Sequence, residues 1–365
     1  MLVGRKSLRS LTTRDETLPA AYSEGLEALS LAPLWTALDA LLPQERVTRV
    51  APHHWRWAEI REPLLEAARL VPMARAERRV LVLMNPGLPG EYAVTATLYA
   101  GLQVILPGES APSHHHTPAA LRLIVEGRGA FTTVEGVKCP MEPGDLIITP
   151  PMRWHDHGHD GTDPVVWLDG LDIPLVRSLE ASWASAMRPA LRPTVPLDSS
   201  ETELTAAGLL PRHSRYADTG YPQVRWPWRR VRAALAGMAA DAPPGTPVVL
   251  RYVNPRTGAS PLPTMGCEAQ WLRPRETTRT ERRTGSGLFH VIEGCGESRI
   301  GDRVVVWEPG DLFVAPPWHW IEHRNRSASA PACLFHLNDE PALRALGLWH
   351  EDLSARLTGP EPHGS

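Results

Sequence analysis

Short apolar runs separated by glycine and proline dominate the hydrophobic pattern of this chain. Residues 95–106 are typical of a buried strand, with Tyr99, Gly101 and Gln103 on one face and mostly aliphatic residues on the other. The odd-numbered face would line a pocket. Helical spacing is confined to short stretches, at residues 26–41 (broken by Pro33), 63–70, 178–187, 227–240 and 341–357. The pattern therefore predicts a mainly β protein with a few helices.

Two stretches of the chain repeat. Residues 287–296 echo residues 120–129, and Pro309-Gly-Asp followed by an apolar run echoes Pro143-Gly-Asp and its run. The repeat predicts two similar barrels. We expect five parts, namely a helical N-terminal arm (1–75), a first barrel (76–176), a connection (177–245), a second barrel (246–340), and a C-terminal helix and tail (341–365).

Composition and charge exclude several classes of partner. Glycine (28) and proline (37) favour turns and short strands over long helices. The net charge of −3 gives no overall attraction to nucleic acid or membrane, and the short aromatic and arginine run at 221–230 favours a packing contact. No apolar run is long enough for a leader or a membrane span, so we expect a cytoplasmic protein. The four cysteines are far apart, as expected for reduced thiols.

A candidate metal site lies in the first repeat. His114 and His116 are two residues apart, so on a strand they share a face, and the apolar run after Pro143-Gly-Asp delivers His155 as a third nitrogen ligand. His155 and His157 could exchange roles, and a polar surface patch is the alternative for the histidine cluster. Residues 117–121 contain no carboxylate, so three neutral imidazoles would hold a divalent ion and leave coordination positions open. These ligands alone do not exclude zinc, nickel or copper.

The spacing Gly108-x5-His114-x-His116, with the later Pro143-Gly-Asp-x4-Pro-x4-His155, is similar to the paired motifs of the cupin superfamily. The strings around Ala120-Leu-Arg, Trp154-His-Asp-His-Gly and Trp167-Leu-Asp-Gly-Leu-Asp resemble the gentisate 1,2-dioxygenase family. The resemblance implies a bicupin, in which two double-stranded β-helix (jelly-roll) barrels are joined by helices. It also implies Fe(II) in the first barrel and a homotetramer.

Two arginines are candidates to bind a substrate carboxylate. Arg122 follows His116 at a same-face spacing of six, and a guanidinium can hold a carboxylate through two hydrogen bonds. The alternative is a structural ion pair with Glu126 or another acid. Arg78 and Arg79 open a strand with alternating faces, and the resemblance places Arg78 over the carboxylate, whereas a solvated surface pair is the ordinary interpretation.

The remaining candidates lie around the predicted metal. Gln103 could hydrogen-bond a polar substituent or be a buried glutamine satisfied by backbone, and Tyr99 would shape the pocket. His157 shares a strand face with His155 and is a candidate acid/base group. Asp169 follows an apolar strand and is a candidate to orient His157.

The second repeat lacks the metal ligands. Glu281, Arg283 and Ile321 stand at the positions equivalent to the three histidines, and this set cannot hold a metal in the same way. His323 is the counterpart of His157, with a structural role. We therefore expect a degenerate second cupin that supports folding or assembly.

The resemblance implies a reaction of a small aromatic hydroxy acid with O2. Gentisate is the leading substrate, with cleavage between C1 and C2 to give maleylpyruvate. One alternative is a relative that opens salicylate, a substituted salicylate or 1-hydroxy-2-naphthoate. The alternative of another class is a metal-dependent cupin that binds a ligand without catalysis, and such a protein would need neither an inward Arg122 nor His157.

Overall fold

The computed structural model describes residues 17–186, 195–196, 221–243 and 246–354, in two compact units, 1–48 and 49–365. In the smaller unit the helical stretch is broken after Pro33, as expected, into α1 (Ala20–Ala28), a 3-10 turn η1 (Leu34–Thr36) and α2 (Leu38–Leu41). None of the described residues of this unit is buried. The arm predicted for residues 1–75 is therefore divided, because residues 49–75 belong to the larger unit.

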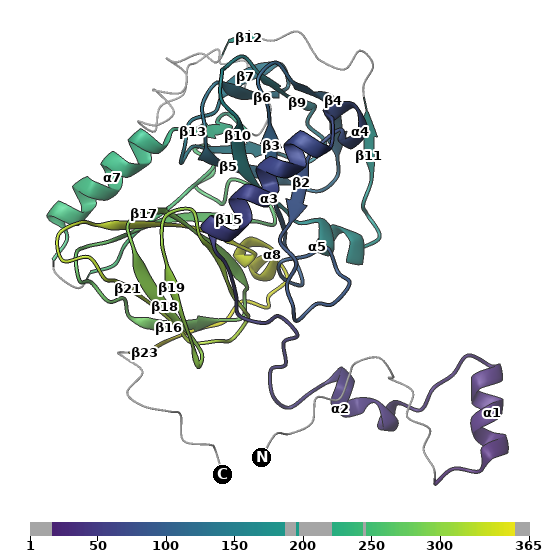
Figure 1. The fold of residues 1–365 in the computed structure, drawn as a ribbon. Helices are drawn as coiled ribbons and strands as arrows, with labels where there is room; N and C mark the ends of the chain where they lie inside the picture. Colours follow the sequence, from purple (N-terminus) through teal and green to yellow (C-terminus); the bar gives the residue numbers. More distant parts are fainter. Residues whose placement is uncertain (1–16, 187–194, 197–220, 244–245, 355–365) are drawn as a thin grey trace. The chain divides into compact units, whose positions relative to one another are not determined.

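Two six-stranded sheets form the first barrel (Figure 1). One sheet has the order β13-β8-β5-β10-β3-β2 and the other β11-β4-β9-β6-β7-β12. The strands are β2 (Val80–Val82), β3 (Tyr99–Ile105), β4 (Ser110–His116), β5 (Ala120–Glu126), β6 (Ala130–Val134), β7 (Val137–Pro140), β8 (Leu146–Thr149), β9 (His155–His159), β10 (Val165–Leu171), β11 (Ala184–Ala186), β12 (Val195–Pro196) and β13 (Arg225–Trp226).

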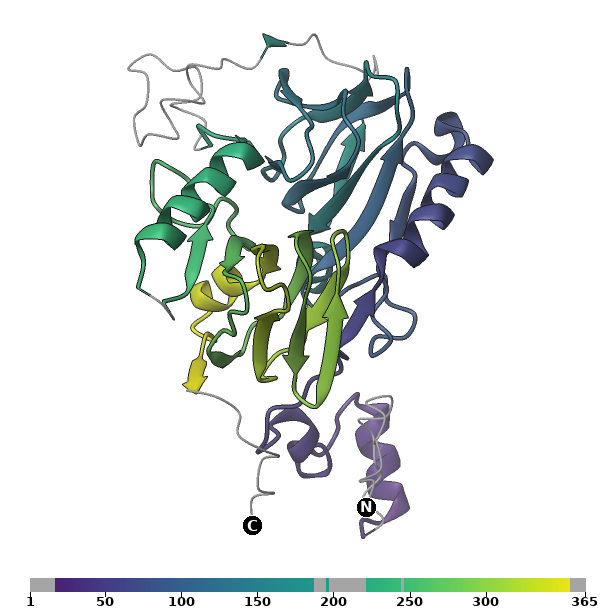
Figure 2. The same ribbon diagram turned by 60° about the vertical axis from the view of Figure 1, so that its left-hand side comes forward.

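The second barrel repeats this arrangement and lies beside the first in both ribbon views (Figures 1 and 2). Its sheets have the orders β1-β20-β17-β22-β15-β14 and β19-β18-β21-β16-β23. The strands are β1 (His53–Trp55), β14 (Val248–Arg251), β15 (Gly266–Leu272), β16 (Thr280–Arg283), β17 (Gly287–Glu293), β18 (Gly296–Ile300), β19 (Arg303–Trp307), β20 (Leu312–Ala315), β21 (Ile321–Asn325), β22 (Ala332–Asn338) and β23 (Glu351–Ser354). The predicted pair of barrels is confirmed.

The two barrels exchange edge strands. β1 precedes the first barrel in sequence but pairs with β20 of the second, whereas β13 from the connection pairs with β8 of the first. The aspartate of each Pro-Gly-Asp turn binds the segment just after the exchanged strand. Asp311 accepts the Trp57 N–H at 2.8 Å, and Asp145 accepts the Trp228 N–H at 2.8 Å. The aromatic run at 221–230 therefore contributes an edge strand and a helix start, in line with a packing role.

The helices differ from the expected ones at several ends. α3 (Trp57–Leu70) starts earlier than expected and contains Pro63, because burial of Leu64 and Ala68 on one face offsets the lost hydrogen bond. None of the described helices has the length and apolar character that a membrane-spanning helix needs. The other helices of the larger unit are α4 (Met73–Ala76), α5 (Ile173–Ser178), α7 (Trp228–Asp241) and α8 (Glu340–Ala345).

Two of the helix predictions are wrong in extent. The helix expected at 178–187 is instead α5, which ends at Ser178, followed by β11, which pairs with β4. The C-terminal helix ends at Ala345, and β23 follows and pairs with β16, and Leu346 is exposed. In both places strand pairing with a distant segment overrides a local helical pattern. Residues 355–357 of the predicted helix lie outside the described residues.

Three apolar clusters stabilise the larger unit. One fills the first barrel around Trp167, one fills the second around Trp307 and Phe313, and the largest joins the barrels and includes Leu121 and Leu337. Burial of these side chains contributes about 1.5–3 kcal/mol each. The barrels therefore share a core.

Gly144, in the first Pro-Gly-Asp turn, has a φ of +85°, and an added Cβ would lie 2.4 Å from the Trp228 ring. Replacing it by alanine is expected to lower the free energy of unfolding by about 2–4 kcal/mol, from the strained backbone and the overpacked indole. Gly237→Ala within α7 is the control, since nothing lies within 4 Å of its added Cβ. It should stabilise by about 0.5–1 kcal/mol in the same denaturant titration. Equal effects of the two substitutions would refute this packing argument.

Candidate metal centre

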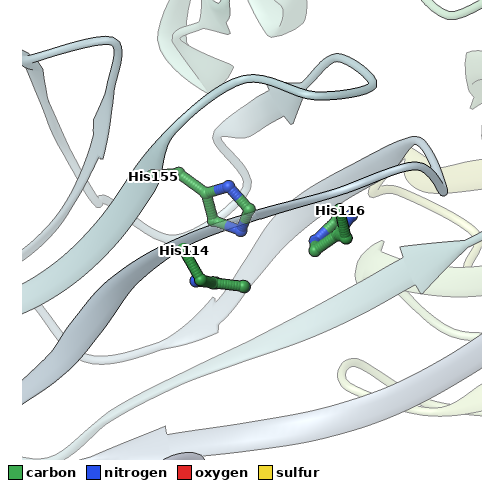
Figure 3. Close-up of side chains that lie close together, drawn as sticks. All are labelled: His114, His116 and His155. Atoms are coloured by element: carbon green, nitrogen blue, oxygen red, sulfur yellow. The ribbon is translucent and has the colours of Figure 1, made fainter. Parts of the chain in front are cut away.

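Three imidazoles converge inside the first barrel. His114 and His116 extend from β4, and His155 opens β9, which pairs with β4 so that His114 stands opposite His155. One nitrogen from each of the three rings lies within 4.8 Å of the other two (Figure 3). His157 is not part of this group. The predicted ligand set is therefore the one that the fold brings together, and the exchange of roles between His155 and His157 is not favoured.

Backbone carbonyls orient two of the rings. His116 Nδ1 lies 2.7 Å from the Pro118 oxygen, and His155 Nδ1 lies 2.9 Å from the Arg153 oxygen. A carbonyl can only accept, so each Nδ1 carries the proton and each Nε2 keeps a lone pair. His155 Nε2 is buried and has no hydrogen-bond partner. A metal ion at the centre would satisfy this otherwise orphaned acceptor.

The imidazoles are held in the neutral form that binds metals. Burial lowers the pKa of His114 to about 2 and of His116 to about 4, with further lowering by Arg78 and Arg122. Burial also lowers the pKa of His155 well below its usual value. Near neutral pH each ring therefore keeps one unprotonated nitrogen, the form that a metal binds.

Arg78 contacts the metal ligand His114 directly. Its guanidinium donates to His114 Nδ1 and, at 3.2 Å, to the Pro112 carbonyl oxygen. A guanidinium can only donate, so His114 Nδ1 accepts here. If His114 coordinates a metal through Nε2, its proton is on Nδ1. The Nδ1–H and the Arg78 guanidinium would then be two donors facing each other. Metal binding by His114 through Nε2 therefore requires Arg78 to move off this nitrogen.

Arg78→Gln is expected to have opposite effects on metal and substrate. Metal affinity should rise by several-fold, because a competing cation leaves His114, while the KM for an aromatic carboxylate should rise about tenfold or more with one charge-assisted hydrogen bond lost. Metal titration and steady-state kinetics measure the two effects. Exposed Arg75→Gln, from α4, is the control and should change neither. A loss of metal affinity in Arg78→Gln would contradict the competition.

Arg122 is buried in the same barrel, on β5. Its Nη1 donates to Thr149 Oγ1 at 2.5 Å, and its Nε lies 3.4 Å from Asp169 Oδ1. The alternative, a structural ion pair with Glu126 or another acid, is found with Asp169, because Glu126 accepts two hydrogen bonds from Arg61 instead. Asp169 and Thr149 fix the guanidinium from two sides and leave its other donors for a ligand.

Asp169 does not orient His157, and that prediction is wrong. Asp169 Oδ1 accepts from the Trp167 indole at 3.0 Å and faces Arg122, and burial raises the Asp169 pKa to about 6 even though Arg122 lowers it. The partner of His157 Nδ1 is the Thr132 hydroxyl, at 2.9 Å, on the paired strand β6. His157 Nε2 is buried and has no hydrogen-bond partner.

The odd-numbered face of β3 points into this barrel. Gly101 stands opposite Asp169, and Gln103 stands opposite Trp167. Gln103 is buried and its Nε2 has no partner, unlike a glutamine satisfied by backbone. A Cβ on Gly101 would lie 2.5 Å from Val80 Cγ1 and 3.0 Å from the Tyr99 hydroxyl, so this wall has no room for a side chain. The wall therefore offers one unsatisfied amide donor to a ligand.

Comparison with known proteins agrees with this geometry. The cupin domain family matches residues 101–171 and 271–338, one stretch in each barrel. A gentisate 1,2-dioxygenase from Ralstonia sp is 44% identical over 339 residues, covering 92% of this chain and 95% of the relative. The chain belongs to the gentisate 1,2-dioxygenase family.

Some proteins that are similar to this chain are dioxygenases named for other substrates. A 5-aminosalicylate 1,2-dioxygenase from Comamonas sp is 35% identical, covering 94% of this chain and 91% of the relative. The crystal structure of a salicylate 1,2-dioxygenase from Pseudaminobacter salicylatoxidans superposes with a TM-score of 0.86 at 32% identity, covering 94% of this chain and 99% of that one. The protein is thus a ring-cleaving dioxygenase of the gentisate and salicylate type with a three-histidine site.

The second barrel of this family member has the expected substitutions. Glu281 stands opposite Ile321 on β16 and β21, as His114 stands opposite His155 in the first barrel. Within the described residues, the only group of three or more side chains placed to hold a metal is the histidine set of the first barrel. His323 is buried and pairs with Ser298 at 2.7 Å, in the same way as His157 pairs with Thr132.

Three side chains next to the dioxygenase site were missed by sequence reasoning. They bond to residues that were predicted, and all lie on neighbouring strands: Thr132, Thr149 and Trp167. Thr149 ends the apolar run after Pro143-Gly-Asp, where a polar residue on an inward-facing strand was a signal. Nothing in the local sequence marks Thr132 or Trp167 as polar partners.

Proposed function

We propose that the protein is an Fe(II)-dependent gentisate 1,2-dioxygenase that opens the ring between C1 and C2 with O2 to give maleylpyruvate. The supporting observation is the group of three neutral imidazoles, within 4.8 Å of one another, in the barrel that also buries Arg122. Three nitrogen ligands leave positions for a chelating substrate and for dioxygen. A binding protein without catalysis would need neither Arg122 nor the unpartnered Nε2 of His157.

The roles of the residues follow from their free donors and acceptors. Bound Fe(II) would supply Lewis acidity and electron transfer to dioxygen. Arg122, fixed by Asp169 and Thr149, would neutralise the substrate carboxylate, and Arg78 would join it after leaving His114. His157 would accept or return a proton at Nε2, with Thr132 holding Nδ1. Both oxygen atoms enter the product as the C1–C2 bond breaks.

Gentisate is favoured over its alternatives by the pocket wall and the relatives. The unpartnered Gln103 amide would donate to a polar ring substituent, which gentisate has and salicylate lacks. The Ralstonia enzyme, 44% identical, is a gentisate 1,2-dioxygenase. A salicylate, substituted salicylate or 1-hydroxy-2-naphthoate dioxygenase is the second proposal, supported by the likeness to the salicylate enzyme. A homotetramer is a further proposal that rests on the resemblance alone, and a cytoplasmic location is a proposal that rests on the sequence pattern.

Oxygen uptake separates these proposals. Protein loaded with Fe(II) under argon is mixed with aerated gentisate, salicylate, 5-aminosalicylate or 1-hydroxy-2-naphthoate, and kcat/KM is determined for each. The highest value with gentisate supports the first proposal, and the highest with another compound moves the protein to the second. No uptake with any of them, at full iron occupancy, would refute both.

Gln103→Leu is expected to lower kcat/KM for gentisate by about tenfold and to leave salicylate nearly unchanged. A site built to hydrogen-bond a substituent loses that discrimination when its donor is removed. The leucine is nearly isosteric, so the buried strand should fold as before. Equal losses of kcat/KM with both substrates would show that Gln103 supports the pocket wall without binding the ring substituent.

A further inference from the structure

A cavity of about 440 Å³ lies in the second barrel. Strand register shows that it corresponds to the metal centre of the first barrel: Glu268 stands opposite His336 as Gly101 stands opposite Asp169, and Ser298 stands opposite His323 as Thr132 stands opposite His157. Its lining includes polar and apolar side chains. Glu268, Glu281, Arg283, His323 and His336 are among the polar ones, and Val249, Phe289, Ile321 and the largely exposed Leu353 are apolar.

Arg283 and the His323 ring face this cavity, which Arg251 and Arg279 also line. Arg283 donates to Glu281, and its Nη1 is 4.0 Å from Glu268, so most of its five N–H groups are still available. The Trp307 indole donates to Ser298 Oγ at 2.9 Å, and Ser298 Oγ lies 2.7 Å from His323 Nδ1. With the Ser298 hydroxyl donating to Nδ1, the ring proton of His323 is on Nε2. Burial, followed by His336 and Arg283, lowers the His323 pKa to about 3, which keeps the ring neutral.

Of the three glutamates that line the cavity, Glu268, Glu281 and Glu351, the first two differ in mobility. Glu268 is buried and held by His336 at 3.0 Å and by Arg251 at 3.2 Å; although burial raises its pKa, the His336 hydrogen bond and the nearby charges lower it to about 2. Among the described residues Glu281 pairs with Arg283, and its side chain is 36% exposed. Glu281 can therefore leave the guanidinium for solvent, whereas Glu268 is fixed.

We propose that this cavity is a second ligand site, which binds a small aromatic carboxylate without metal and without turnover. The ligand carboxylate would replace Glu281 on Arg283, an exchange that leaves the charge of the cavity unchanged once Glu281 is solvated. His323 Nε2 would donate to the carboxylate or to an adjacent hydroxyl. Val249, Ile321 and Leu353 would contact the ring, and the volume lies within the range of small-molecule sites. The proposal is independent of the reaction proposed for the first barrel.

The test is ¹⁹F NMR and equilibrium dialysis of 5-fluorosalicylate with the full-length, iron-loaded protein under argon, so that no turnover occurs. Two bound molecules per chain, with two bound resonances, are expected. The resonance from the second barrel should persist in His155→Ala and after iron removal, which separates this site from the metal centre. A single bound molecule per chain that disappears with the metal centre would overturn the proposal.

Two substitutions should change the ligand affinity of the second site in opposite directions. Arg283→Gln should weaken it by at least about tenfold, and Glu281→Gln should tighten it by about threefold or more, because the internal competitor is gone. Arg282→Gln is the matched control, since that neighbour on β16 pairs with Asp352 and stacks on Trp318 and Trp320. Glu281→Gln keeps the test valid if Arg283→Gln fails to fold. Weaker binding in Glu281→Gln, or no change in Arg283→Gln, would contradict the exchange.

Discussion

His155→Ala is expected to abolish ring cleavage by removing the metal. His155 Nε2 is buried, unpartnered and directed at the other two imidazoles, and no carboxylate of the described residues joins this group as a substitute ligand. Metal affinity should fall by more than about a hundredfold, since even residues outside the ligand shell change it by about 10–100-fold. Iron content after gel filtration and oxygen uptake measure the two losses.

His157→Ala is the matched variant for this prediction. It removes a buried imidazole from the same strand, two residues away, but leaves the three-ligand group intact. It should retain iron and lose turnover by about 10²–10⁴-fold, the range of a missing acid/base group. Loss of iron in His157→Ala with retention in His155→Ala would reverse the two roles.

Arg122→Lys is expected to lower kcat/KM by about two orders of magnitude, or about 3 kcal/mol of transition-state stabilisation, with iron retained. The lysine keeps a positive charge next to buried Asp169, so the fold does not gain an unpaired buried carboxylate. It cannot, however, contact Thr149, Asp169 and a substrate carboxylate with one fixed planar group. Most of the loss should appear in KM for substrates and vanish for a phenol without a carboxylate.

The control for this prediction is Arg128→Lys. Arg128 lies just after the same strand, pairs with Glu142 and is largely exposed, so an exposed ion pair worth about 0–1 kcal/mol is all that changes. Its kinetics should match those of the unchanged protein. If Arg122→Lys keeps full kcat/KM, the guanidinium serves only to neutralise Asp169.

The metal ligands could be predicted from sequence because they depend on local rules. The two-residue spacing of His114 and His116 fixes a shared face on any strand, and the Pro-Gly-Asp turn fixes where the next strand begins. The internal repeat likewise predicts both barrels and the positions where Glu281 and Arg283 replace ligands. These inferences need no knowledge of which strands pair.

Partners across strands could not be predicted in the same way. Asp169 was assigned to His157, but register places Thr132 opposite His157 and Arg122 opposite Asp169. Register depends on the whole sheet, and no single segment specifies it. The exchange of β1 and β13 between the barrels is a further case, because β1 pairs with a strand more than 250 residues away.

The most direct test of the central claim is one anaerobic reaction mixture of iron-loaded protein and gentisate, started with ¹⁸O2 and analysed by mass spectrometry. The account predicts a ring-opened product that contains both labelled oxygen atoms, apart from exchange with water, formed in proportion to the iron bound by the three histidines. Product that forms without iron, or that carries only one atom from ¹⁸O2 after correction for exchange, would contradict it.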